Sequence, residues 1–398
     1  MSGCAEGGDE DRPQSEVTLR ADHHLFGFRT ARGFGAFPVT AADVAGTTID
    51  SVRRELRLFQ DANYQRVEFP GGGEDIASDS YALTTRGELS LLVTGGGSEP
   101  TVVFRGAYSR VADPDTEPVD FFYTDRVSTP ASPTIGLFYG TRVVAGAVEL
   151  AGDYHLLSLH LILNGDSAAS FDGVGRGAFG NVTVGAGAAG ALRSLDGSGT
   201  QRNSAVSFNG SSIRNLLGDG RDNGRCIVTV RYDVTGEPPD DREMLAAASN
   251  NTVMALDADE EDGEVGMLML VRKFASNAQT SQMRGTFLVG GHTLFVDQSN
   301  SGSDTFVGTV TLGEGNFFRL DGVSNTGADF AYTGTWTANT EGRLTINIPS
   351  SGSSSAQEWS AAIDRSYNTL VIIDAIPEQR SNSTIRELNF VVGVRRNG

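Results

Sequence analysis

Five histidines are the first residues of this 398-residue chain that could do chemistry: His23, His24, His155, His160 and His292. His160 and His292 fall at nearly the same position of a repeat described below, so they could be a repeated ligand or buried structural residues. His155 and His160 are five apart and therefore point to opposite faces of a strand. The sequence has no His-Glu-x-x-His and no second pair of zinc ligands, so we predict no metal site.

The carboxylates give no better candidate for catalysis. The acidic run Asp257–Gly263 has its glycine at position seven instead of six, and Leu268 stands where an EF-hand needs a bidentate glutamate. Asp257 and Asp374 recur at matching strand ends, but they could act as a glycosidase pair only within about 5–10 Å, which the repeat spacing does not suggest. Gly-x-Ser-x-Gly is absent, and the one lysine, Lys273, fits no phosphate loop or Ser-x-x-Lys motif. We therefore predict a protein that is not an enzyme and binds no cofactor.

The two cysteines differ in their surroundings. Cys226 lies in the apolar run Cys226-Ile-Val-Thr-Val and is predicted to be a buried thiol. Met1-Ser2-Gly3-Cys4-Ala5 resembles the end of a bacterial lipoprotein signal, in which small residues precede a cysteine that becomes lipidated. The resemblance implies a lipid on Cys4, a flexible tether over residues 1–22, and an extracytoplasmic location in the periplasm, at the outer membrane or on the cell surface. A chance Ser-Gly-Cys is the other interpretation.

Composition indicates an all-β protein that does not bind nucleic acid. Fifty glycines with 39% hydrophobic residues favour many short strands joined by tight turns. The formal charge of −19 repels nucleic acid and anionic membranes. No run of about 18 apolar residues occurs, so we expect contact with a membrane only through the lipid anchor.

An apolar stretch that ends in arginine recurs and sets the period of the chain. Its four copies are Leu25–Arg29, Leu137–Arg142, Met267–Arg272 and Phe390–Arg395. Their arginines are 113, 130 and 123 residues apart (142−29, 272−142, 395−272). A fixed period indicates repeated supersecondary units. We therefore predict three tandem β repeats of about 120 residues, at 23–145, 146–275 and 276–398.

Each repeat reads as about eight strands with short connections, which is an antiparallel meander. Asp50–Phe59 could be a helix taken alone, but its place in the repeat favours a strand. Closure into a barrel leaves no unpaired edge. The strands at 154–163 and 389–394 are apolar on both faces, however, which is also typical of the blades of a six-bladed β-propeller. We rank eight-stranded barrels first and the propeller second.

The second and third repeats open with glycine and an aromatic residue, at Gly152-Asp-Tyr154 and Gly285-Thr-Phe287. With the arginine-ending last strand, this resembles the calycin superfamily of lipocalin-like barrels. There, an arginine of the last strand lies over the aromatic ring of the first.

The resemblance implies that Arg272 lies over Tyr154 and Arg395 over Phe287. Arg142 would close the first repeat, where Thr48 stands at the position of the ring. Leu25–Arg29 has no repeat before it to close. It would be either an entry segment or the strand that closes a propeller. First-to-last pairing within each repeat indicates barrels, whereas pairing of residues near 25 with those near 395 indicates a propeller.

The family resemblance also implies a function: a non-catalytic binding protein that takes a small apolar ligand in a barrel interior. The alternative is a structural or adhesive surface protein whose repeats present loops to a partner in the cell envelope. The second function predicts an exposed apolar or aromatic patch across the repeats and no cavity.

The lipid anchor on Cys4 can be tested by mass spectrometry of the membrane fraction. We expect the mature chain to begin at Cys4 and to carry the added mass of acyl chains. A soluble cytoplasmic protein with an unmodified Met1 would contradict the prediction.

Overall fold

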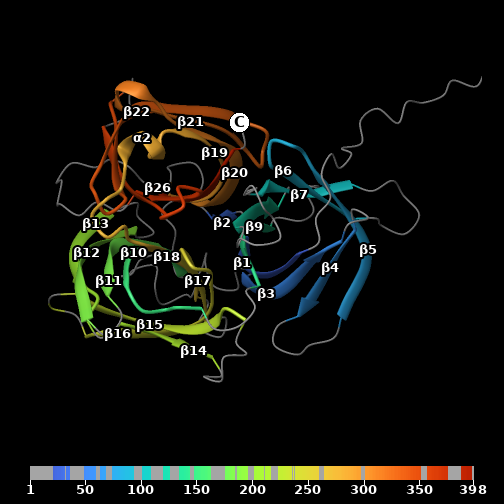
Figure 1. Cartoon of the computed structure of the whole chain (residues 1–398), viewed down its shortest axis with the longest axis horizontal. Helices are drawn as coiled ribbons and strands as arrows, with labels where there is room; N and C mark the ends of the chain where they lie inside the picture. The colour runs from blue at the N-terminus through green and yellow to red at the C-terminus, as the bar shows by residue number, and fades with distance from the viewer. Residues whose placement is uncertain are drawn as a thin grey trace, which may run out of the picture.

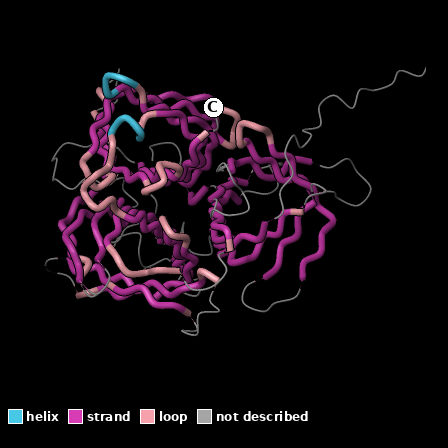
Figure 2. The backbone as a smooth tube through the Cα atoms, in the orientation of Figure 1, coloured by secondary structure: helices cyan, strands magenta, loops and turns pink. Residues whose placement is uncertain are grey.

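The fold of the chain is given by a computed structural model (Figures 1 and 2). The structure describes residues 21–31, 33–35, 49–59, 63–68, 74–93, 101–108, 120–125, 134–143, 148–162, 175–183, 186–195, 201–209, 211–216, 223–234, 236, 238–259, 264–296, 301–350, 356–374 and 387–396. Cys4 and the residues 1–20 lie outside the described part of the chain.

The strands form three antiparallel barrels of eight strands each, in the order of the sequence. Barrel 1 contains β1 (Ala21–Ala31), β3 (Ile49–Leu58), β4 (Asn63–Glu68), β5 (Glu74–Leu83), β6 (Glu88–Val93), β7 (Thr101–Tyr108), β8 (Asp120–Asp125) and β9 (Thr134–Arg142). Barrel 2 contains β10 (Asp153–Ile162), β11 (Gly175–Thr183), β12 (Ala186–Leu195), β13 (Gln201–Ser207), β15 (Arg225–Val234), β16 (Asp240–Ala248), β17 (Thr252–Asp259) and β18 (Glu264–Arg272). Barrel 3 contains β19 (Gly285–Val296), β20 (Ser301–Leu312), β21 (Phe317–Ser324), β22 (Asp329–Ala338), β23 (Arg343–Ile348), β24 (Gln357–Ile363), β25 (Thr369–Ile373) and β26 (Glu387–Arg395).

Smaller elements complete the described fold. The short strand β2 (Gly33–Gly35) pairs with β20, and β14 (Ser212–Asn215) pairs with β15. The helical segments are α2 (Thr280–Met283) and a 3-10 turn at Glu314–Asn316. No helix in the described part of the chain is long and apolar enough to cross a bilayer.

Pairing of the first strand with the last closes each of the three barrels on itself. β1 pairs with β9, β10 with β18, and β19 with β26. Additional pairings of β13 with β15 and of β19 with β20 complete the rings of barrels 2 and 3. The six-bladed propeller is therefore wrong, and the all-β fold of eight-stranded barrels is confirmed. The region 50–59 is a strand, as the repeat predicted.

The Leu25–Arg29 copy has a different place from either predicted one. It lies in β1, the opening strand of barrel 1, and it pairs with the Leu137–Arg142 copy in β9. The register places His23 opposite Arg142, as Tyr154 lies opposite Arg272 and Phe287 opposite Arg395. His23, not Thr48, therefore stands at the ring position of barrel 1. Thr48 lies outside the described residues.

Arginine and an aromatic ring join the first strand to the last in barrels 2 and 3. The guanidinium carbon of Arg272 lies 5.1 Å from the ring centroid of Tyr154, and that of Arg395 lies 4.8 Å from the ring centroid of Phe287. Arg272 also donates to the Tyr154 hydroxyl at 2.6 Å and to the carbonyl oxygen of Glu149. Each arginine thus combines stacking with hydrogen bonds at the seam of its barrel.

Gly285 is required by the close approach of Arg395. The backbone of Gly285 has φ of 150°, and an added Cβ would lie 2.5 Å from Nη1 of Arg395. Gly152 likewise has a positive φ, 138°, beside Arg272. The Gly-x-aromatic pattern therefore has a physical cause: only glycine adopts this backbone easily and leaves room for the arginine.

The three barrels stand side by side around an apolar centre (Figure 1). We call this cluster the central core, and all three barrels contribute outward-facing side chains to it. Its buried members include Phe26, Phe28, Leu137 and Tyr139 of barrel 1, Leu157, Leu159 and Met269 of barrel 2, and Leu294, Phe390 and Val392 of barrel 3. The alternate residues of the same strands fill the barrel interiors, as Leu156 and Leu270 do in barrel 2. The strands that are apolar on both faces are thus the ones buried on both faces.

Polar contacts also join the barrels in pairs. His24 Nε2 lies 2.7 Å from the carbonyl oxygen of Asn223, which joins barrel 1 to barrel 2. The hydroxyls of Thr30 and Ser303 are 3.0 Å apart, which joins barrel 1 to barrel 3. His155 Nε2 lies 3.1 Å from the carbonyl oxygen of Glu341, and Arg343 lies over the ring of Phe179 at 4.7 Å. Barrels 2 and 3 are therefore joined at their outer faces.

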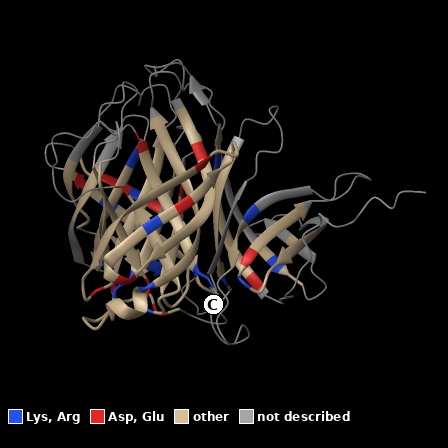
Figure 3. Ribbon diagram, turned by 90° about the horizontal axis from the view of Figure 1, so that it is seen from above, with Lys and Arg blue, Asp and Glu red and all other residues tan. Residues whose placement is uncertain are grey.

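The Arg395 seam should carry measurable stability. Its guanidinium donates to the carbonyl oxygens of Tyr367, Gln282 and Arg284 at 2.6, 2.7 and 2.8 Å. Two of these acceptors are in or beside α2, which lies at the same end of the molecule as the C-terminus (Figure 3). Arg395→Met keeps the apolar stem but removes every donor, so we expect a loss of about 2–4 kcal/mol in the free energy of unfolding, measured with denaturant.

Arg396→Met is the matched control for that change. Arg396 follows directly on the strand, and we expect its replacement to change stability by no more than about 0.5 kcal/mol. Equal effects of the two substitutions would contradict the proposed importance of the Arg395 contacts.

Candidate functional site

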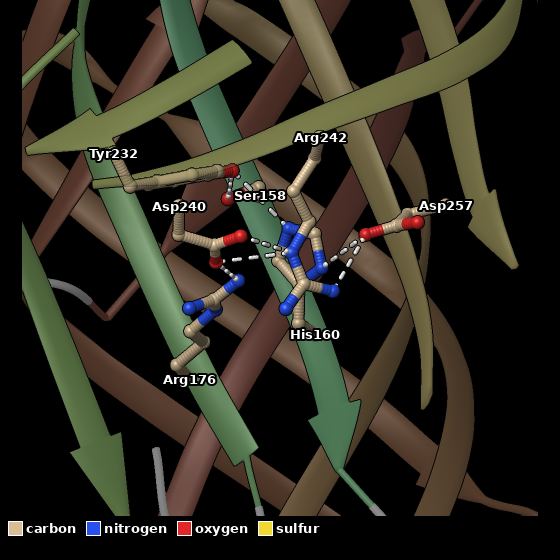
Figure 4. Close-up of polar contacts among 7 residues, drawn as sticks. All are labelled: Ser158, His160, Arg176, Tyr232, Asp240, Arg242 and Asp257. Atoms are coloured by element: carbon tan, nitrogen blue, oxygen red, sulfur yellow. Dashed lines mark hydrogen bonds and ion pairs between the residues drawn. The ribbon is translucent and has the colours of Figure 1, made fainter. Parts of the chain in front are cut away.

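A layer of polar side chains crosses the interior of barrel 2, about six residues along β10 from Tyr154 (Figure 4). Its members come from β10, β11, β15, β16 and β17, and all project inward between apolar interior residues. We call these residues the polar layer: Ser158, His160, Arg176, Tyr232, Asp240, Arg242 and Asp257. This is the largest convergence of chemically capable side chains that the interior of barrel 2 offers among its described residues.

Two arginines and two aspartates form the charged part of the polar layer. Arg242 donates from Nη1 to Asp257 at 2.9 Å and from Nε to both oxygens of Asp240 at 3.1 and 3.2 Å. Arg176 donates to Asp240 at 2.8 Å and lies over the ring of Tyr232 at 4.9 Å. The charges of these groups balance within the layer, as buried ion pairs require.

A chain of contacts then leads from Asp257 to Ser158. His160 Nδ1 lies 3.4 Å from Asp257 Oδ2, and His160 Nε2 lies 3.2 Å from the hydroxyl of Tyr232. That hydroxyl is 3.4 Å from Oγ of Ser158. Gly266 makes room for the imidazole, because a Cβ there would lie 2.2 Å from His160 Nδ1.

Electrostatics keeps the polar layer in one protonation state at neutral pH. Burial lowers the pKa of His160 to about 4, although its contact with Asp257 opposes the shift. Burial would raise the pKa of Asp257, but His160 and Arg242 outweigh it and hold that pKa below its ordinary value. Burial also raises the pKa of Tyr232. His160 and Tyr232 are therefore neutral and Asp257 is ionised.

The arrangement has the order of a serine, histidine and aspartate relay with a tyrosine inserted, but its serine, histidine and tyrosine are buried. Ser158, His160 and Tyr232 are each no more than 1% exposed. A nucleophile must contact its substrate. The polar layer of barrel 2 therefore fills the barrel and fixes its packing.

Barrel 3 carries different residues in the corresponding layer. Thr293 lies six residues after Phe287, as His160 lies six residues after Tyr154, so Thr293 occupies the place of His160. The strand register pairs His160 with Arg176 and Thr293 with Asp304, so Asp304 occupies the place of Arg176. In the same way, Asn389 replaces Gly266, Gln357 replaces Arg242, and Asp374 corresponds to Asp257. The two arginines of barrel 2 thus have no counterpart at these positions of barrel 3.

A cavity of about 240 Å³ lies in barrel 3 at this layer. We call it the barrel 3 cavity. Its apolar wall contains Phe295, Phe306, Leu320, Phe330, Tyr332, Trp359 and Val391. Its polar wall contains Thr293, Asp304, Thr305, Ser324, Glu387 and Asn389. The volume is somewhat below the roughly 300–1,000 Å³ of pockets for drug-sized ligands, so any occupant is small.

Contacts between lining residues hold the cavity in shape. Thr293 donates to Asn389 at 2.7 Å, and the amide of Asn389 donates to Asp374 at 3.1 Å. The rings of Phe306, Phe330, Tyr332 and Trp359 follow one another with centroids 5.0, 5.8 and 5.3 Å apart, each pair edge to face. Burial raises the pKa of Tyr332 to about 12, and the negative charges of Glu387 and Asp374 add to the shift.

A larger hollow of about 520 Å³ lies where barrel 2 connects to barrel 3, lined by Phe274, Ala275, Asn277, Gln279, Gln282, Arg365 and Tyr367. It lies on the surface beside the Arg395 seam and is open to solvent, so it encloses little of any ligand. The barrel 3 cavity is smaller but is surrounded by strands and rings. Enclosure by apolar side chains with a few convergent polar groups is what ligand sites share, and we take the barrel 3 cavity as the candidate site.

The histidines that the sequence singled out lie apart from that cavity. His160 points into barrel 2, whereas His292 points out of barrel 3 toward Phe28, with ring centroids 4.9 Å apart. Their positions differ by one residue and therefore by one face of the strand, so they do not form a repeated ligand position, and both are buried. His155 faces outward, opposite to His160, as their spacing predicted. Within the described residues, no group of three His, Cys, Asp or Glu side chains is placed to hold a metal ion.

The remaining sequence candidates are structural in position. Tyr154, Arg272, Phe287 and Arg395 lie at the barrel seams, about 20 Å along the strand from the cavity layer, at about 3.3 Å per residue. Arg142 lies at the seam of barrel 1 opposite His23, and Cys226 is a buried free thiol. Sequence reasoning missed the cavity residues. The one sequence feature that could have indicated them is that Asp304 stands at the position of the third predicted repeat that matches Arg176 in the second.

Comparison with known proteins gives distant structural likenesses only. No protein-family model and no curated protein matches the chain. Among solved structures, a double mutant of transferrin binding protein B from Haemophilus parasuis Hp5 is 8% identical with a TM-score of 0.29, over 98% of this chain and 78% of that one. Isotype 1 transferrin binding protein B from serogroup B Neisseria meningitidis is 9% identical with a TM-score of 0.27, over 97% of this chain and 79% of that one. Folds with such low TM-scores do not superpose closely, so no property of those proteins is carried over.

Acidification should destabilise the fold through its buried histidines. Burial lowers the pKa of His292 from 6.5 to about 3, with no charged group contributing, and burial lowers that of His155 to about 4. A base with a lowered pKa stabilises the fold above its unfolded pKa, and this stability is lost as the pH falls toward the folded pKa.

His292→Leu removes one such group. Between pH 6.5 and about pH 4.5 we expect this variant to lose about 2–3 kcal/mol less stability than the parent protein, measured by denaturant unfolding at both pH values. Leu294→Val, on the same outer face of β19, is the control and should leave the pH dependence unchanged. Parallel pH profiles of His292→Leu and the parent would contradict this account.

Proposed function

We propose that this protein is a non-catalytic binding protein and that the barrel 3 cavity takes a small molecule. The observation that carries the proposal is the contrast between two barrels of the same construction. In barrel 2 the layer is filled by its own histidine, arginines and tyrosine. In barrel 3 smaller or differently charged residues stand at the matching positions and a cavity remains.

A cavity of this kind is costly to keep without an occupant. The side chains around it lose packing contacts, which lowers stability in proportion to the empty volume. The lining also differs from that of an apolar packing defect, because carboxylate, amide and hydroxyl groups enter it from several strands. These features support a binding site over a flaw in packing.

The lining also changes the type of ligand that the sequence resemblance implied. A wholly apolar ligand would remove water from Asp304, Glu387 and Asn389 and give no hydrogen bond in return, which is unfavourable. We therefore propose a ligand with an apolar body and a polar head instead of the small apolar ligand first expected. Binding without chemistry is supported by the burial of Ser158, His160 and Tyr232, which keeps their contact chain from substrate.

The extracytoplasmic location, and the lipid on Cys4 that would hold the protein at a membrane, remain part of the proposal. They rest on the Ser-Gly-Cys sequence, which lies outside the described residues. The adhesive alternative has less support. The large apolar side chains that are exposed in the described part of the chain are Phe59 in barrel 1 and Phe317 and Val323 in barrel 3, and these do not form a patch across the three repeats.

Tryptophan emission offers a direct test of binding, because both tryptophans of the chain, Trp336 and Trp359, lie in barrel 3 and Trp359 lines the cavity. We would titrate the full chain with benzylamine, benzyl alcohol and benzoate, three single-ring compounds of similar shape. At least one should change the emission saturably, with calorimetry giving the same affinity.

Two phenylalanine variants locate the binding. Thr293→Phe places a ring in the cavity and should lower the affinity of the compound that binds at least tenfold. Thr337→Phe adds the same ring at an exposed position on the outer face of β22 and should leave the affinity unchanged. If no compound binds, or if Thr293→Phe binds as well as the parent, the proposed function is wrong.

A further inference from the structure

The surface hollow where barrel 2 connects to barrel 3 is bounded by two segments of the chain. We call it the connection hollow, and its volume is about 520 Å³. Residues 274–282 of the connection form one side, and Arg365 and Tyr367 of the turn between β24 and β25 form the other. The connection hollow has no lining residue in common with the barrel 3 cavity, so it is a separate site.

The turn between β24 and β25 is longer than its counterpart in barrel 2. Residues 249–252 form this turn in barrel 2, between β16 and β17, whereas residues 364–369 form it in barrel 3. The seam arginines donate their backbone N–H groups to the carbonyl oxygens of Asn251 and Asn368, at 2.8 and 2.7 Å, so these two asparagines match. The added residues therefore fall within 365–367, which supplies both side chains that the turn contributes to the hollow.

Tyr367 has a left-handed backbone, with φ of 60°, which is rare for a bulky residue. Its N–H donates to the carbonyl oxygen of Asp364 at 2.9 Å, and its own carbonyl oxygen accepts from Nε of Arg395 at 2.6 Å. Its hydroxyl accepts from the N–H of Gln279 at 3.0 Å, and its ring lies beside that of Phe274, with centroids 4.9 Å apart. Glycine or asparagine would adopt this backbone with less strain, so a tyrosine here points to a use for its ring.

Arg365 is the one charged residue among the described residues that line the hollow. Its Nε donates to the carbonyl oxygen of Lys273 at 2.6 Å, which orients the guanidinium. Within the described part of the chain Arg365 has no carboxylate partner, and the carboxylate of Glu341 pairs with Lys273 at 3.3 Å. The two terminal nitrogens of Arg365 are therefore available to a planar anion, and their fork matches the two oxygens of a carboxylate.

Amide side chains complete the wall of the hollow. Asn277, Gln279 and Gln282 line it, and an amide group offers both a donor and an acceptor. The backbone of this segment is held in place, because the N–H groups of Phe274 and Ala278 donate at 3.1 Å to the turn between β22 and β23. A wall that is already fixed loses little conformational freedom when a ligand binds.

We infer that the connection hollow binds a carboxylate attached to an apolar group, with the carboxylate on the guanidinium of Arg365 and the apolar group against the rings of Phe274 and Tyr367. The hollow is open, so it covers one end of a ligand and leaves the rest in solvent. A small organic acid and the C-terminal residue of a peptide both have this chemistry. The inference goes beyond the proposed function, because it concerns a second site.

The charge of the site favours a carboxylate over a phosphate. The chain as a whole carries −19, which repels anions at long range. At about 0.15 M salt this field is screened beyond about 8 Å, so the contact with Arg365 decides. One guanidinium balances the single charge of a carboxylate, whereas phosphate groups carry more charge and are held by clusters of arginines.

The test compares charge at nearly constant shape by calorimetry on the full chain. Phenylacetate is an anion at pH 7 and phenylacetamide is its neutral analogue. Acetyl-Gly-Phe with a free C-terminus and the same peptide with a C-terminal amide are the second pair. We expect the acid that binds to have at least tenfold higher affinity than its amide, and the acid with the higher affinity identifies the source. Equal affinities of acid and amide in both pairs, or no binding of either acid, would overturn the inference.

Variants of the hollow then identify the residues. Arg365→Gln should lower the affinity for the acid at least tenfold and leave that for its amide within about twofold. Arg319→Gln is the control, since it removes the same charge from the outer face of β21, where Arg319 pairs with Asp321, and it should change neither affinity. Tyr367→Asn removes the ring at a backbone that asparagine adopts, so it should lower both affinities. Unchanged affinity for the acid in Arg365→Gln would overturn the inference.

Thr293→Phe separates this site from the barrel 3 cavity. It fills the cavity and should leave the affinity for the acid unchanged, whether or not the cavity binds a ligand of its own. A tenfold loss in this variant would place the acid in the cavity and overturn the inference. Displacement of the acid by inorganic phosphate at equal ionic strength would also overturn it, in favour of a phosphate site.

Discussion

Burial on two faces is the constraint on which the rest of this structure depends. The first and last strands of each barrel face a barrel interior on one side and the central core on the other. Each of their large side chains stabilises the fold by about 1.5–3 kcal/mol when buried. Because alternate residues point to opposite faces, a shift of one residue in any of these strands would exchange the interior set for the central set. The central core therefore fixes the register of all three barrels at once.

Two regions along the strands of barrels 2 and 3 have different roles: one closes the barrel, and the other determines what its interior can hold. The seam level holds the arginine and the ring, and it is nearly the same in barrels 2 and 3, down to a glycine with positive φ. The interior layer, about 20 Å along the strand, is filled by ion pairs in barrel 2 and hollow in barrel 3. Because the seam and the central core close the barrel without help from this layer, its residues can change without loss of the fold.

Sequence reasoning could reach the closure but not the cavity. The arginine-ending strands and the Gly-x-aromatic openings contain residue types that are rare at other positions of a strand. They can therefore be recognised in a single sequence, and they predict the seam pairs. The Leu25–Arg29 copy misled for a physical reason: first and last strands are neighbours buried on both faces, so they have similar patterns, and in barrel 1 His23 replaces the ring. His160 and His292 lie at nearly the same repeat position, but a difference of one residue in a strand places them on opposite faces. Enclosure of a cavity depends on the register of six strands, which no single motif encodes.

The polar layer of barrel 2 and the cavity layer of barrel 3 share an aspartate but differ in the residues around it. A buried carboxylate at the Asp257 position is tolerated only with compensation, and barrel 2 supplies it from Arg242 and His160. Barrel 3 has Asp374 at this position, and Asn389, which is itself oriented by Thr293, donates a hydrogen bond to it. The exchange of Arg176 for Asp304 and of Arg242 for Gln357 thus accompanies the cavity in barrel 3, whereas the aspartate at the Asp257 position is unchanged.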